Sequence, residues 1–247
     1  MELFEGDLSK PDTLVPALAG IGTALLTSSP DPNQAKLQNN FIDAARRAKL
    51  GHLVKISAMG AALDSPVSFC RWHAETEQYL KHSGIPYTVL QPNFFMQNML
   101  SFAPTIAAEG KFYGSMKDGK ASFVDIRDIA AVAAATLTGD GHAGKTYRIT
   151  GPEILSFADI AAKLSFALGK PVTYVDIPRT ALVQAMTGSG LPDWQAEGIA
   201  GLYDWGAKGG FAEVTSVVTD VGGKQPISFD EFARNFAPAF QVAKTAR

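Results

Sequence analysis

The sequence predicts an α/β protein in which a doubly wound parallel sheet is followed by a smaller, mainly helical region. Three observations support this prediction. Short apolar strands alternate with helical patterns up to residue 92, a further strand follows at 145–150, and the residues after it are mostly helical. Strands interleaved with helices form right-handed crossovers, which make neighbouring strands parallel. We therefore expect two domains, one at 1–150 built on the sheet and one at 151–247 that caps it.

The first two strands are predicted from short apolar runs. Leu3 and Phe4, followed by "EGDLSKP", are typical of the end of a buried strand that turns into a helix. The run "GTALLTSSP" at 22–30 predicts a second buried strand that stops at hydroxyl residues. The helix after it, "NQAKLQNNFIDAARRAKL", is expected to bury one face, formed by Leu37, Phe41, Ala45 and Ala48.

Two more strands complete the alternating part of the chain. The segments "HLVKIS" at 52–57 and "PYTVLQP" at 86–92 are apolar, and the helix between them, "VSFCRWHAETEQYLKHSG", stops at Gly84. In a sheet of this kind the ligand crevice lies at the carboxyl ends of the strands. The residues expected at those ends are Asp7, Thr27, Ser28, Ser29, Ser57 and the loop from Gln91 to Phe94.

The regular alternation of predicted strands and helices ends beyond residue 95. Helices are predicted in "FMQNMLSFAPTIAAEG" and in "SFVDIRDIAAVAAATLT", the second after a short extended piece, and "KTYRIT" at 145–150 predicts a strand. Two later helices carry capping motifs, Ser156 with Asp159 and Ser228 with Glu231. These motifs fix where the helices begin.

Composition excludes several classes of protein. A net charge of −2 and a pI near 6.1 give no electrostatic reason to expect nucleic acid or an anionic membrane as a partner. A single cysteine, Cys70, cannot form a disulfide framework or a thiolate metal site within one chain, and we expect no metal. No apolar stretch is long enough for a membrane span, and the start lacks the layout of a signal peptide. We expect a cytoplasmic protein.

Two features bear on chemistry. No strand is followed by the glycine-rich turn that holds a dinucleotide pyrophosphate at a helix N-terminus. His73 and Glu77 lie four residues apart and therefore share a helix face. In short-chain dehydrogenases the corresponding helix presents Tyr-x-x-x-Lys, assisted by a serine from the preceding strand. On residues alone, a partly exposed pair that adds little to stability is favoured about two to one over a catalytic pair.

From Asp7 to Gly151, and more loosely to the end, the chain resembles the NmrA-like branch of atypical short-chain dehydrogenases. The most specific matches are "HAETEQYLKHSGIPYTVLQPNFFMQN", "DIRDIAAVAAATL" and "GKTYRITGP". The sequence is similar to the NAD(P)H:quinone reductase and triphenylmethane reductase members, which implies a Rossmann-like fold and NADP(H) or NAD(H) as cofactor. The implied chemistry is hydride transfer to a quinone-like or aromatic acceptor. Family members likewise have His and Glu where dehydrogenases have Tyr and Lys.

The resemblance assigns roles by position. His73, Glu77 and Ser57 become the catalytic candidates. Gly6 and Asp7 resemble the adenine-side contact, Thr27, Ser28 and Ser29 the segment along the ribose and pyrophosphate, and Ser57 with Gln91, Pro92, Asn93, Phe94 and Asn98 the nicotinamide side. Gln91 stands where relatives commonly have arginine, so the charge of the substrate does not follow from the resemblance.

Relatives begin with a strand, a glycine-rich turn, a helix and a second strand, and this chain begins after them, so we expect a truncated product. Without those strands the "TALLT" strand is expected to have an open edge, and the chain to be marginally stable, re-paired or a homodimer. Three functions remain open: a reductase, a dinucleotide-sensing regulator without turnover, and an inactive fragment. Two interpretations are open for five aromatic residues: they line an acceptor pocket, or they belong to the core. Aromatic residues at such spacings are core residues about three times as often. The five are Phe94, Phe95, Trp194, Tyr203 and Trp205.

Overall fold

The computed structural model describes residues 3–241, which form two compact units. The N-terminal unit comprises residues 1–92 and 131–148, and the C-terminal unit comprises residues 93–130 and 149–247. The chain thus leaves the N-terminal unit after Pro92, returns to it at Ala131 and leaves it again after Arg148. The predicted division into domains at 1–150 and 151–247 stays a prediction.

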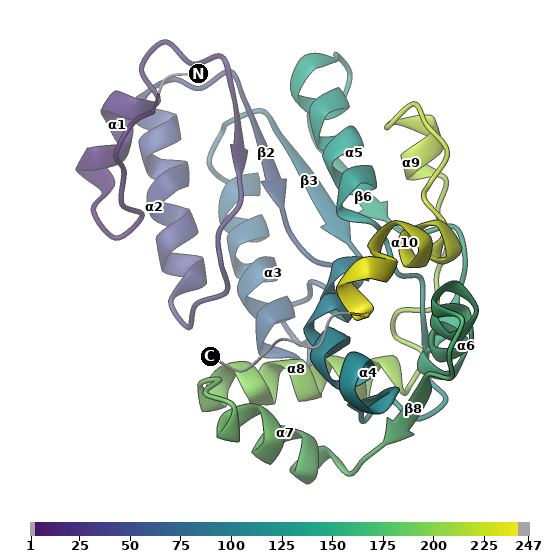
Figure 1. Ribbon diagram of the computed structural model, residues 1–247. Helices are drawn as coiled ribbons and strands as arrows, with labels where there is room; N and C mark the ends of the chain where they lie inside the picture. The colour runs from purple at the N-terminus through teal and green to yellow at the C-terminus, as the bar shows by residue number, and fades with distance from the viewer. Residues whose placement is uncertain (1–2, 242–247) are drawn as a thin grey trace. The chain divides into compact units, whose positions relative to one another are not determined.

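The N-terminal unit is built on a four-stranded sheet in the order β1-β2-β3-β6 (Figure 1). The first three strands are parallel, with Leu25 opposite Val54 and Val54 opposite Thr88. Its strands are β1 (Thr23–Leu26), β2 (His52–Ile56), β3 (Tyr87–Pro92) and β6 (Lys145–Ile149). Its other elements are the 3-10 turn η1 (Pro11–Thr13) and the helices α1 (Leu14–Ala17), α2 (Gln34–Arg47) and α3 (Ser68–Lys81). The parallel α/β fold predicted from the alternation is confirmed.

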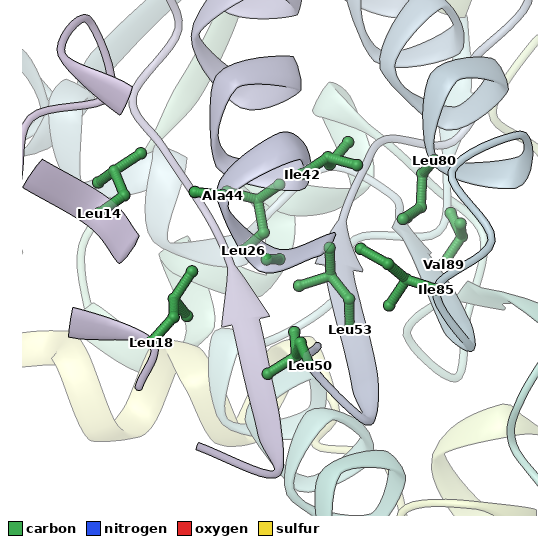
Figure 2. Packing of buried hydrophobic residues seen from close by; sticks show 11 residues of the cluster. Leu14, Leu18, Leu26, Ile42, Ala44, Leu50, Leu53, Leu80, Ile85 and Val89 are labelled. Carbon is green, nitrogen blue, oxygen red and sulfur yellow. The ribbon is translucent and has the colours of Figure 1, made fainter. Parts of the chain in front are cut away.

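Helices α2 and α3 pack side by side against the sheet and bury a common apolar core (Figure 2). Leu26 and Leu53 reach the core from β1 and β2, Ile42 from α2 and Leu80 from α3. All four side chains are at most 2% exposed. A fully buried side chain of this size contributes about 1.5–3 kcal/mol to folding. This core fixes the spacing between the strand ends and the two helices that carry polar side chains beside them.

The predicted strand at the start of the chain is wrong where the structure describes it. Residues 3–7 form no strand, and Leu3 and Phe4 are 83% and 56% exposed; Glu2 lies outside the described residues. A strand needs a hydrogen-bonded neighbour, and β1 pairs only with β2 within residues 3–241. As predicted, β1 therefore lies at an edge, with Leu25 40% exposed. Its pairing with a second copy stays a prediction.

The expected buried face of α2 also needs correction. The helix forms as predicted, but its buried residues are Gln34, Gln38, Ile42, Ala44 and Ala45, while Leu37 is only partly buried. The prediction assumed that the buried face of the helix consists of its apolar residues. In the structure the side-chain amides of Gln34 and Gln38 occupy the buried positions in the first turns. Those amides contact polar groups at the ends of neighbouring elements, as described below.

The C-terminal unit is mostly helical and contains two small sheets, one with β4 parallel to β8 and one with β5 antiparallel to β7. Its strands are β4 (Lys111–Gly114), β5 (Lys120–Ala121), β7 (Leu155–Ser156) and β8 (Thr173–Asp176). Its helices are η2 (Met96–Phe102), α4 (Ala103–Glu109), α6 (Phe157–Leu168), α7 (Arg179–Gly188), α8 (Asp193–Gly206), α9 (Val217–Asp220), α10 (Phe229–Phe236) and η3 (Ala237–Phe240). Helix α5 (Ile126–Thr138) is shared between the two units.

Both predicted capping motifs mark helix starts. Ser156 and Asp159 form a reciprocal capping box on α6, and the Ser228 hydroxyl accepts from the Glu231 amide at the start of α10. The four short strands of this unit were not predicted. No helix in the described part of the chain is long and apolar enough to cross a membrane.

Candidate functional site at the carboxyl edge of the sheet

Ser57 and Gln91 meet at Glu77, and these three residues are named here the Glu77 cluster. Ser57 directly follows β2, Gln91 is the last residue but one of β3, and Glu77 projects from α3. The Ser57 hydroxyl donates to Glu77 Oε1 at 2.5 Å, and Gln91 Nε2 donates to the same oxygen at 2.9 Å. All three side chains are buried. The carboxylate thus ties the ends of two strands to one helix.

A second group of polar side chains lies one turn earlier on α3, and we name it the Lys55 cluster. Lys55, the last residue but one of β2, is completely buried, and its ammonium group lies 3.1 Å from His73 Nδ1 and donates to the Ile56 carbonyl at 3.2 Å. The side-chain amide nitrogen of Gln34 lies 3.3 Å and 3.4 Å from the two ring nitrogens of His73. His73 and Glu77 therefore share a helix face but have different neighbours.

Electrostatics separates the two clusters further. Burial lowers the pKa of Lys55 to about 7, although the nearby Glu77 carboxylate works in the opposite direction. Burial, and then the positive charge of Lys55, hold the pKa of His73 well below its ordinary range. The imidazole is consequently neutral at physiological pH, so it can donate or accept a hydrogen bond but carries no charge.

The hydroxyl residues after β1 lie beside the amides of α2. Ser28 accepts a hydrogen bond from Gln38 Nε2 at 2.9 Å, while Thr27 and Ser29 are exposed. The other amide atom of Gln38, Oε1, is buried and accepts no hydrogen bond from the residues that the structure describes. An open acceptor beside exposed hydroxyls suits a ligand rich in hydroxyl groups.

Gly6 and Asp7 lie in the turn before η1. Asp7 Oδ1 accepts from the Ser9 amide at 2.8 Å and from the Ser9 hydroxyl at 2.7 Å, and these hydrogen bonds lower the pKa of Asp7. The Asp7 amide donates to Thr13 Oγ1 at 2.9 Å. The side chain that was predicted to contact adenine therefore organises a local turn in this structure.

Three further predicted residues belong to the C-terminal unit. Asn93 is buried, and its amide nitrogen donates to Ser122 Oγ at 2.7 Å and to the Phe211 carbonyl at 2.9 Å. Phe94 is partly buried, and Asn98 is exposed on η2. Pro92 ends β3 and precedes Asn93 directly, so the chain passes from one unit to the other inside the predicted nicotinamide-side segment.

Aromatic rings gather around Phe94 within the C-terminal unit. The Phe94 ring lies 4.6 Å from Phe211 and 6.2 Å from Tyr203, and the Trp205 ring lies 4.4 Å from Phe211. Burial raises the pKa of Tyr203 to about 12, which keeps the phenol protonated. Three of the five aromatic residues named from the sequence thus belong to one cluster, which suits either a core or a binding wall.

Sequence reasoning missed three polar residues beside the candidate site: Lys55, Gln34 and Gln38. Lys55 carried a signal, because a lysine inside "HLVKIS" interrupts an otherwise apolar parallel strand. The two glutamines are four apart at the start of α2, a spacing that places them on one face. Only the packed structure shows that this is the buried face. No group of residues suited to a metal ion occurs in the part of the chain that the structure describes.

Comparison with known proteins gives a consistent result. A model of the NmrA-like family matches residues 1–233. An NAD(P)H azoreductase of Xenophilus azovorans is 42% identical over 238 residues, which cover 96% of this chain and 83% of the relative. The solved structure of an NADPH-dependent quinone oxidoreductase from Escherichia coli, complexed with NADPH, is 30% identical with a TM-score of 0.87, covering 94% of this chain and 82% of that one. A Citrobacter triphenylmethane reductase complexed with NADP(H) shares the fold at 24% identity, with a TM-score of 0.86 and coverage of 96% and 84%.

Proposed function

This chain belongs to the NmrA-like family, and from that membership we propose that it is an NAD(P)H-dependent reductase of flat aromatic or quinone-like acceptors. The observation that carries the proposal is the 42% identity to an NAD(P)H azoreductase along 96% of the chain. Azo dyes and quinones are both planar conjugated acceptors. The solved NADPH complex of a quinone oxidoreductase with the same fold supports the same class of cofactor.

The polar groups at the carboxyl edge of the sheet fit part of a dinucleotide. Gln38 Oε1 has no hydrogen-bond donor among the described residues, and a ribose hydroxyl is a donor of the kind it requires. Ser28 and Ser29 offer hydroxyls at the same strand end. The pyrophosphate is not fitted in this way, because no glycine-rich turn follows a strand in the 247 residues. We therefore assign these residues to the sugar and nicotinamide portions of the cofactor.

Glu77 and His73, two of the three catalytic candidates, have different roles from each other in this proposal. Glu77 already accepts hydrogen bonds from Ser57 and Gln91, so we infer that it is a positioning residue that holds the ends of β2 and β3. His73 is neutral and partly exposed, which suits a hydrogen-bond donor to an acceptor or cofactor oxygen. Reduced nicotinamide, when bound, supplies the hydride. The protein then contributes orientation and a water-poor setting rather than a strong acid.

A glycine-rich turn at a helix N-terminus would hold the pyrophosphate of the cofactor and so bears on affinity. We propose that a strand, glycine-rich turn, helix and second strand taken from the azoreductase, joined before Met1, strengthen NADPH binding by the chain. Fluorescence titration of both proteins with NADPH measures this. Equal affinity of the two would show that the pyrophosphate is held without a glycine-rich turn.

The activity is tested by the loss of reduced-cofactor absorbance with an azo dye, a quinone or a triphenylmethane dye as acceptor. We expect oxidation of NADPH only when an acceptor is present, and a lower rate for His73→Asn than for the control His82→Asn at the end of the same helix. NADPH binding with no oxidation by any acceptor would instead favour a dinucleotide-sensing regulator. An absence of both binding and oxidation, even in the extended protein, would contradict the proposal.

A further inference from the structure

The Lys55 cluster contains a buried cation without a carboxylate in contact. Lys55 is 0% exposed, and within residues 3–241 no acidic side chain lies within ion-pair distance of its ammonium nitrogen. Its two hydrogen-bond partners are the Ile56 carbonyl and the His73 ring. A lysine buried without a countercharge is destabilising, so its retention in β2 calls for a role other than stability.

The geometry restricts the protonation of His73. A charged ammonium group has three hydrogens to donate and no lone pair with which to accept. Nδ1 of His73, 3.1 Å from Lys55 Nζ, must then be the acceptor, and in a neutral imidazole the proton is left on the other nitrogen, Nε2. The Gln34 amide nitrogen lies 3.3 Å from Nδ1 and 3.4 Å from Nε2 and so does not distinguish the two ring nitrogens, which leaves Lys55 as the group that does.

We propose that Lys55 is the positioning residue of His73: its ammonium group donates to Nδ1 and thereby holds the neutral ring with its proton on Nε2. This inference rests on the proposed function for its purpose, because a reductase that lacks the dehydrogenase tyrosine still needs a hydrogen-bond donor beside its substrate. With the proton on Nε2, His73 is a hydrogen-bond donor at the ring nitrogen that Lys55 does not contact. With the opposite tautomer Nε2 would be a hydrogen-bond acceptor.

Few charged groups surround Lys55 and His73 among the described residues. Among residues 3–241, Glu77, on the same helix as His73, is the carboxylate whose charge acts on Lys55, and it favours the ammonium form. From α2 the contact is the neutral amide of Gln34, and from β2 it is the neutral carbonyl of Ile56. Loss of the Lys55 proton, which is centred near pH 7, releases the restriction on the ring. The tautomer is therefore fixed below that pH and free to exchange above it.

The test is nuclear magnetic resonance of the full chain with 15N-labelled histidine, which distinguishes protonated from unprotonated ring nitrogens without cofactor or turnover. At pH 6 the wild-type protein is expected to show His73 neutral, with Nε2 alone protonated. In Lys55→Met both tautomers are expected, and the pKa of His73 should move upward towards its ordinary range. The control, Lys36→Met on the exposed face of α2, should leave the His73 signals unchanged.

Unchanged His73 signals in a folded Lys55→Met protein would overturn the proposal. If that variant does not fold, the wild-type spectrum at pH 6 decides by itself, since protonation of Nδ1 there contradicts the assigned geometry. Turnover is measured separately with NADPH and an azo dye. If the tautomer is fixed but no turnover occurs, the role of Lys55 stands and the proposed reductase activity is contradicted. If turnover occurs but the tautomer is not fixed, the reductase activity stands and the role of Lys55 is contradicted.

Discussion

The Glu77 and Lys55 clusters lie one helical turn apart on α3 and differ in the sign of the group at their centre. In the Glu77 cluster a buried carboxylate receives two direct hydrogen bonds, from Ser57 and Gln91, and Lys81 Nζ approaches its other oxygen to 3.7 Å. In the Lys55 cluster a buried ammonium group has, within the described part of the chain, only neutral hydrogen-bond partners. Hydrogen bonds and a nearby lysine compensate the buried charge of Glu77, whereas no opposite charge contacts the ammonium group of Lys55 within the described residues. Removing the central charge should therefore harm the first cluster and stabilise the second.

The largest effect is expected from Glu77→Leu. The change leaves the Ser57 hydroxyl and the Gln91 amide buried without their acceptor, and it removes the carboxylate that favours a charged Lys55. Breaking a buried, hydrogen-bonded charge in this way lowers the free energy of unfolding by about 3 kcal/mol. Chemical denaturation at pH 7 measures the loss, with Glu75→Leu, an exposed position on the same helix, as the control. A loss no larger than that of the control would mean that Glu77 is not the centre of its cluster.

Lys55→Met should have the opposite sign. Replacing a buried charge by an apolar side chain of similar length is expected to raise the free energy of unfolding by about 2 kcal/mol near pH 7. The pKa of Lys55 is lowered to about 7 in the folded protein from its ordinary value of 10.5, so between these values the unfolded chain binds more protons. The stability of the wild-type protein should consequently rise as the pH increases through that window, and this rise should be absent in Lys55→Met. Denaturation curves from about pH 6 to about pH 10, which span most of the window between about 7 and 10.5, measure both effects.

A stabilised variant would sharpen the comparison, because it would show that Lys55 is kept at a cost to folding. Equal pH dependence in Lys55→Met and wild type would instead mean that Lys55 keeps its proton throughout the window. Lys36→Met is again the matched control, since it removes the same charge from an exposed position.

Ser57→Ala tests one bond of the Glu77 cluster. The alanine removes a hydroxyl that donates at 2.5 Å, but Glu77 keeps its hydrogen bond from Gln91, so the expected loss is about 1 kcal/mol. Thermal unfolding compared with Ser29→Ala, which changes an exposed serine, provides the measurement. A loss as large as that of Glu77→Leu would indicate that the two donors act as one unit rather than separately.

The fold could be predicted largely from the sequence, and the site only in outline. Alternating apolar strands and helices located β1, β2, β3, α2 and α3 because local periodicity reports which face is buried. The predicted strand at Leu3 and Phe4 is wrong, because strand formation depends on a partner that local sequence does not contain. Ser57 and Gln91 both lie at strand ends and donate to Glu77, but the sequence did not show that the two side chains share one of its oxygens. Which side chain fills the space between a helix and a strand is decided by tertiary packing, and Lys55 and Gln34 were missed for that reason.

The smallest effect is expected from Gln34→Leu, at the outer end of the Lys55 cluster. Gln34 is buried, but its contacts with the His73 ring are long, 3.3 Å and 3.4 Å, and both groups are neutral. The lost hydrogen bonding is offset by the burial of an apolar side chain, so the free energy of unfolding should change by about 0.5 kcal/mol or less. Gln38→Leu, four residues along the same face, removes a shorter 2.9 Å bond to Ser28 and should cost more. Denaturation of the two variants side by side measures the difference. The reverse order would mean that Gln34 holds His73 more firmly than Lys55 does, and that the ring is positioned from α2 rather than from β2.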